Sequence, residues 1–138
     1  MVILIIFVVV ASLIPRVATT LGHSRVNRSA MVIAADFLLA QSLAARQHMP
    51  VRVQVVGTSP DSLLVLKILD AQSGNVLRTE YFDKKNSDFK LAALSAAPAS
   101  VLVMPNGTAG ASMVVTVGGT DYYHLVRITQ AGQVRITQ

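Results

Sequence analysis

The chain contains no cysteine, and this absence excludes several classes of protein. Disulfide-stapled folds, thiolate zinc sites and cysteine nucleophiles all need a thiol. Tryptophan is also absent and aromatic residues reach only 5%, which argues against an aromatic platform for stacking bases or sugars. Charged residues make up only 14% of the chain, so a solvated disordered sequence is excluded as well.

What is present is an apolar chain of 138 residues, 52% of them hydrophobic, long enough for one domain with a single modest core. The net charge of +5 and the pI of about 10.1 permit contact with anionic partners. Net charge alone does not indicate a fold.

An uncharged apolar run occupies residues 2–14 and ends at Pro15. As a helix it would extend roughly 20 Å, which is less than the roughly 30 Å hydrocarbon core of a bilayer. It could be a secretory signal, although no basic region precedes it. It could be a buried strand or helix, which is the usual meaning of so short a run. The third interpretation is the end of a longer membrane helix whose beginning lies upstream of Met1.

The following segment favours the third interpretation. Residues 17–47 contain no proline and one glycine, and alanine, leucine and arginine dominate, all of which are good helix formers. Apolar residues recur at helical spacing on one stripe, formed by Val26, Ala30, Ile33, Phe37, Ala40 and Ala44. We therefore predict an apolar helix over 1–15, kinked or restarted at Pro15, and an amphipathic helix over 16–48.

Beyond Pro50 the periodicity changes to that of β-strands. Residues 51–56 alternate at period two, and turn residues separate the later apolar segments. Residues 89–99 remain ambiguous between a helical turn and an irregular crossing. The pattern predicts an α+β fold, with the long helix packed on an antiparallel β-sheet head over 49–138. The expected strands are 51–56, 63–69, 76–82, 101–104, 113–117, 122–129 and 134–137.

Three stretches resemble the type IV pilin and pseudopilin superfamily. They are the apolar run ending in Pro15, the helix-to-strand junction at residues 40–53, and the tail containing Pro105-Asn-Gly107 and Gly132-Gln-Val-Arg135. The closer resemblance is to the GspH/FimT family, which comprises H-type minor pseudopilins of type II secretion and FimT-type pilus proteins. The separation of Pro15 and Pro50 by 35 residues is also similar to the spacing in that family.

This resemblance implies a structural minor pseudopilin or minor pilin, with no enzymatic activity. It implies a single-pass protein of the bacterial inner membrane with its head in the periplasm, whose partners are other pilin subunits and the membrane assembly machinery. The N-terminal methylation of the family is also implied. The implied membrane and assembly residues are Val2, Ile3, Leu4, Ile5, Ile6, Phe7, Val8, Val9, Val10, Leu13, Ile14 and Pro15.

One departure concerns the leader. The family is processed within a leader ending in Gly-Phe-Thr-Leu-Ile-Glu, and neither the cleavage motif nor the glutamate is present here. We expect these residues to lie upstream of Met1. The alternative is a subunit that has lost processing. The choice between a secretion system and a pilus or competence system stays open.

No motif predicts catalysis. His23, His48 and His124 lack metal-ligand spacing, and there is no Gly-x-Ser-x-Gly elbow to present a nucleophile. The Gly107 and Gly118 regions lack the Gly-Lys-Ser/Thr ending of a phosphate loop and lie between expected strands. We predict no catalytic residue, no metal, no cofactor and no small-molecule substrate.

The basic residues suggest one alternative function. Some FimT-type proteins are implicated in DNA uptake through a basic Gly-Arg-x-Arg loop. The matching stretch here, Gly132-Gln-Val-Arg135, has glutamine in place of the first arginine. Arg127 and Arg135 lie on strands that the last turn should bring together, and they are the candidate DNA contacts. Arg16, Arg25 and Arg28 follow the apolar run and indicate a helix surface facing solvent or lipid headgroups.

Overall fold

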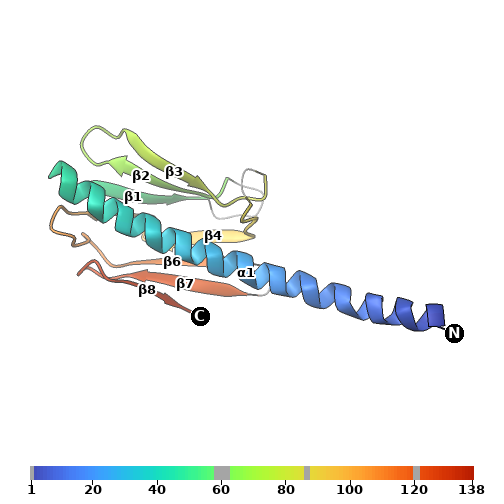
Figure 1. Cartoon of the computed structure of the whole chain (residues 1–138). Coiled ribbons are helices and arrows are strands. Elements are labelled where there is room, and N and C mark those ends of the chain that lie inside the picture. The colour runs from blue at the N-terminus through green and yellow to red at the C-terminus, as the bar shows by residue number, and fades with distance from the viewer. Residues whose placement is uncertain (1, 58–62, 86–87, 120–121) are drawn as a thin grey trace.

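The computed structural model describes residues 2–57, 63–85, 88–119 and 122–138, with side chains from residue 20 onward. Its single described helix, α1 (Val2–Gln47), has 46 residues and is therefore about 70 Å long. The helix passes through Pro15 without ending, so the predicted restart there is wrong. Proline removes only one hydrogen bond from the helical ladder, and the ribbon runs unbroken from its N-terminal end to the head (Figure 1).

The described head residues form two four-stranded antiparallel sheets where the sequence suggested one. Their orders are β3-β2-β1-β5 and β4-β6-β7-β8. The first sheet contains β1 (Val51–Val56), β2 (Val65–Asp70), β3 (Val76–Tyr81) and β5 (Ser100–Val103). The second contains β4 (Ala93–Ala97), β6 (Met113–Gly118), β7 (Tyr123–Ile128) and β8 (Val134–Thr137).

The split between the sheets occurs where the sequence was ambiguous. β4 pairs with β6, and β5 pairs with β1, yet only Pro98 and Ala99 separate the two strands. Proline has no backbone N–H and cannot continue a ladder, so the chain changes sheets at this point. The segment 89–99 thus contains a strand that alanine-rich composition did not indicate.

The helix stripe forms the centre of the core, as the sequence predicts. All six of its residues are at most 1% exposed. They face alternate residues of both sheets, among them Val53 of β1, Val115 of β6 and Val126 of β7, each also at most 1% exposed. Figure 1 shows α1 lying along both sheets, while its N-terminal part extends beyond the head.

Candidate functional site

The predicted membrane and assembly segment, residues 2–15, forms the start of α1 and lies outside the head (Figure 1). It continues into the half of the helix that carries the head without any intervening loop. The head and the apolar segment are therefore joined by one continuous helix.

By length and composition, α1 could cross a membrane. Among the residues with described side chains, Thr20–Gln47 is long and apolar enough to do so. The same segment packs on the two sheets. A core helix of a soluble protein has the same length and composition. The uncharged run at residues 2–14 predicts a membrane segment from the sequence.

Where α1 leaves the head, aromatic contacts attach it to the second sheet. The rings of His23 and Tyr122 stack with centroids 4.1 Å apart and planes 7° apart. The Tyr122 hydroxyl lies 3.0 Å from Nε2 of His124, and the side-chain amide of Gln138 donates a hydrogen bond of 2.7 Å to that hydroxyl. The helix, β7 and the end of the chain therefore meet at one tyrosine.

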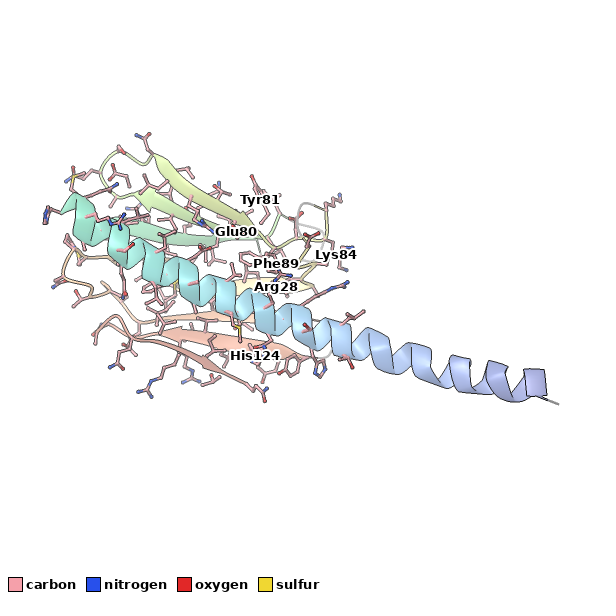
Figure 2. The ribbon with its side chains drawn as sticks, viewed as in Figure 1. Arg28, Glu80, Tyr81, Lys84, Phe89 and His124 are labelled. Atoms are coloured by element: carbon pink, nitrogen blue, oxygen red, sulfur yellow. The ribbon has the colours of Figure 1, made fainter. Side chains whose placement is uncertain are left out.

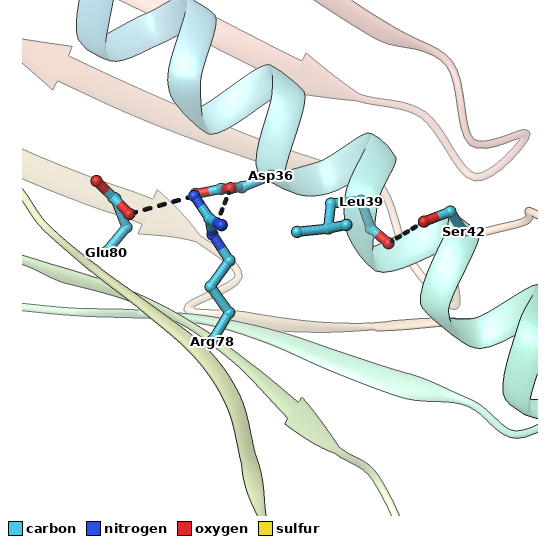
Figure 3. A network of polar contacts seen from close by, with 5 residues as sticks. All are labelled: Asp36, Leu39, Ser42, Arg78 and Glu80. Carbon is cyan, nitrogen blue, oxygen red and sulfur yellow. Dashed lines mark hydrogen bonds and ion pairs between the residues drawn. The ribbon is translucent and has the colours of Figure 1, made fainter.

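A buried carboxylate connects α1 to the edge strand β3. Arg78 Nε lies 2.9 Å from Oδ1 of Asp36, and a second guanidinium nitrogen lies 3.4 Å from Glu80 (Figure 3). The Asp36 side chain is only 3% exposed, and its Oδ2 has no hydrogen-bond partner among the described residues. Burial therefore raises the pKa of Asp36, and the nearby charge of Arg78 opposes that rise.

Further along the helix, Gln41 holds two turns of the head together. Its side-chain amide donates to the carbonyl oxygen of Gly107 at 3.1 Å and to that of Gly132 at 2.8 Å. These glycines belong to the two tail motifs that carry the family resemblance, Pro105-Asn-Gly107 and Gly132-Gln-Val-Arg135. Gln41 therefore attaches both turns of the tail to the helix.

The two candidate DNA contacts lie directly opposite each other. In the register of β7 and β8, Arg127 pairs with Arg135, as the position of the last turn predicts. Both side chains are exposed, and the neighbours Val126 and Ile128 point into the core, so the arginines face away from α1. None of the described strands of this sheet contains an acidic residue. Paired like charges repel, so this arrangement favours an anionic ligand.

Sequence patterns alone did not predict the contacts of Asp36 and Gln41. One signal was available: Asp36 comes three residues after Ile33 and four before Ala40, which places it at the edge of the buried stripe. A carboxylate in that position needs a cationic partner. The partner comes from the distant strand β3, and no local sequence pattern identifies it as Arg78.

The three histidines do not form a metal site in the described part of the chain. No group of three or more His, Cys, Asp or Glu residues there could hold a metal ion. His23 and His124 are committed to contacts with Tyr122, and His48 lies exposed just after the helix ends.

The fold is that of a type IV pilin-like protein. Two crystal forms of the type IV minor pilin FimU of Pseudomonas aeruginosa superpose on the chain. The first has a TM-score of 0.63 and 22% identity, and the match covers 84% of this chain and 90% of FimU. The second has a TM-score of 0.59 and 22% identity, covering 81% and 92%. At this identity the likeness establishes the shared fold.

Comparison at the level of sequence yields nothing further, because no protein-family model and no curated protein matches the chain.

Proposed function

We propose that this chain is a structural minor pilin or pseudopilin subunit of a type IV pilus or type II secretion fibre. The observation that supports it is the single continuous helix, which packs on the head through one stripe and extends beyond the head through residues 2–15. The minor pilin FimU shares the fold over 84% of this chain. Before assembly the apolar run lies in the inner membrane, and the head lies in the periplasm.

Assembly then transfers the apolar run from lipid to a bundle of other subunits' helices. Such a transfer keeps apolar side chains covered in both states, so packing and not the hydrophobic effect selects the partner. In this proposal Val2 to Pro15 mediate anchoring and assembly, and the partners are other pilin or pseudopilin subunits with the inner-membrane machinery.

The test uses the full chain in a bacterium that carries the fibre system encoded beside its gene. We expect the chain to resist alkaline extraction from membranes and to appear in the sheared fibre fraction. Val9→Arg should remove it from both fractions, because a charge at the centre of a membrane helix costs roughly 3 kcal/mol. Thr116→Arg, a substitution in the second sheet, is the matched control. An alkali-extractable wild-type chain that is absent from the fibres would contradict the proposal.

The genes beside this one separate the two systems. Secretion genes support a pseudopilin of the GspH type, and pilus or competence genes support a FimT-type pilin.

A second candidate function, DNA binding by a FimT-type minor pilin, is favoured by the opposed pair Arg127 and Arg135. Phosphate contact requires affinity that falls steeply with salt. Arg135→Ala should weaken duplex binding and reduce the salt slope by about 1, whereas Arg46→Ala on the helix should not. Binding that does not depend on salt would rule out this function.

A further inference from the structure

The end of the head from which α1 emerges combines cations from two distant parts of the chain. Arg25 and Arg28 lie on the helix, and Lys84 lies in the loop that follows β3 (Figure 2). Lys85 and Lys90 belong to the same loop, and all five side chains are exposed. We refer to Arg25, Arg28, Lys84, Lys85 and Lys90 as the basic surface.

Packing holds the described ends of this loop, on either side of residues 86–87, against the helix. The rings of Phe82 and Phe89 lie 5.1 Å apart, and the N–H of Leu91 donates to the carbonyl of Phe82 at 2.9 Å, which closes the loop. The guanidinium of Arg28 lies 5.6 Å from the centre of the Phe89 ring (Figure 2). This is within the range of a cation–π interaction, so the helix and the loop present their charges together.

The charge of this region is strongly asymmetric. Segments 20–30 and 82–92 contain the five cations and two acids, Asp83 and Asp88. Asp83 is only 4% exposed, so Asp88 is the one acid that these two segments expose among their described residues. Five exposed cations against one exposed carboxylate create a positive surface.

The position of the basic surface relative to the apolar run indicates its ligand. Arg25 follows Pro15 by ten residues, which is about 15 Å of helix. The headgroup layer adds roughly 7 Å on each side of the hydrocarbon core. Long Lys and Arg side chains cover much of the remaining distance by extending toward the interface. A helix inserted through residues 2–14 therefore brings Arg25 close to the headgroups, and Arg28, one turn further along, contacts the loop that carries the lysines.

We propose that the basic surface binds anionic phospholipid headgroups and holds the head against the bilayer while the subunit is in the membrane. This inference rests on the proposed function, because it requires residues 2–14 to be in lipid. The contact is electrostatic, so it adds to the anchor and determines the orientation of the head. It ends when the subunit leaves the membrane for a fibre.

The experiment measures hydrogen–deuterium exchange of the full chain in lipid nanodiscs. One set contains phosphatidylcholine alone, and the other contains equal parts of phosphatidylcholine and phosphatidylglycerol. We expect segment 82–92 to exchange at least about fivefold more slowly in the anionic nanodiscs, because each Lys or Arg near an anionic surface contributes roughly that factor in binding. The difference should shrink as salt is added, since screening shortens the reach of surface charges. The turn at Pro105–Gly107, at the far end of α1, should exchange equally in both.

A triple variant, Lys84→Gln with Lys85→Gln and Lys90→Gln, should lose the response to phosphatidylglycerol. The matched control removes the same charge elsewhere through Arg46→Gln, Arg52→Gln and Lys67→Gln, and should keep the response. The wild-type salt dependence tests the proposal even if the triple variant fails to fold.

The outcomes separate this inference from the proposed function. Failure of the wild-type chain to insert into phosphatidylcholine nanodiscs contradicts the membrane anchor itself. Normal insertion with equal exchange of segment 82–92 in both lipids overturns only the headgroup contact. Protection of segment 82–92 by duplex DNA in detergent, without a response to phosphatidylglycerol, would identify a nucleic-acid surface and also overturn the inference.

Discussion

The side-chain amide of Gln41 donates a hydrogen bond of 2.8 Å to the carbonyl oxygen of Gly132, across 91 positions of sequence. The same amide reaches Gly107 at 3.1 Å. One helix residue thus connects α1 to two turns of the tail, and both turns come from the motifs that resemble the pilin family. These two bonds attach the tail to the helix.

Gln41→Ala should destabilise the full chain by about 1–3 kcal/mol, because two partly buried carbonyl groups lose their donor. Chemical unfolding in detergent micelles measures the change. Gln47→Ala, at an exposed position in the same helix, should lie within about 0.5 kcal/mol of wild type. Equal stability of the two variants would show that the Gln41 bonds contribute nothing to the fold.

The turn at Gly132 leaves no room for a side chain. Its φ is +79°, and a Cβ there would overlap the carbonyl oxygen of Gly107. Gly132→Ala should therefore cost about 3 kcal/mol through backbone strain and steric overlap. Gly74 has a similar φ of +73° with open space around it, so Gly74→Ala should cost only about 1 kcal/mol. Thermal unfolding compares the two, and a smaller loss for Gly132→Ala would contradict the observed packing.

Truncating side chains of α1 should destabilise the fold only on the buried face of the helix. Phe37 is 1% exposed, and Phe37→Ala should destabilise the chain by about 3–5 kcal/mol by leaving a cavity between the helix and the sheets. Met31 lies on the other face and is 56% exposed, so Met31→Ala should change stability by no more than about 0.5 kcal/mol. Denaturant unfolding of both variants measures the contrast, and similar losses would mean that α1 packs through a different face.

Burial of Asp36 makes stability dependent on pH, and the ion pair with Arg78 opposes that effect. Because burial raises the pKa of Asp36, the folded state binds that proton more tightly than the unfolded state does. The resulting contribution is fully present below the ordinary value of 3.8, and it is lost as pH rises through the higher folded pKa. Asp36→Asn should remove this part of the pH profile of unfolding.

Arg78→Gln removes the partner and leaves the carboxylate buried. At neutral pH it should cost about 1–2 kcal/mol, less than a fully buried pair because the Arg78 side chain is 44% exposed. The pKa of Asp36 should rise further, and the loss should shrink as acid protonates the carboxyl group. In the Asp36→Asn background, Arg78→Gln should have little effect at any pH. A loss that is constant across pH would refute the coupling.

Local sequence patterns were enough to predict the buried face of the helix and several of the strands. The stripe from Val26 to Ala44 predicted the buried face of the helix, because helical spacing repeats over a few residues and needs no partner to be recognised. Alternation and turn residues predicted the strands at 51–56 and 134–137 with the observed bounds. The apolar run at residues 2–14 is likewise recognised from its composition alone.

Tertiary structure decided the rest. The pairing of Asp36 with Arg78, the contact of Gln41 with Gly132, and the addition of Lys84 to the helix arginines each join residues more than 40 positions apart. The effect of Pro98 was also not predictable from local sequence. It divides the head into two sheets and does not merely end a strand. Periodicity reports which face of an element is buried, whereas the packing of distant elements determines which residues meet there.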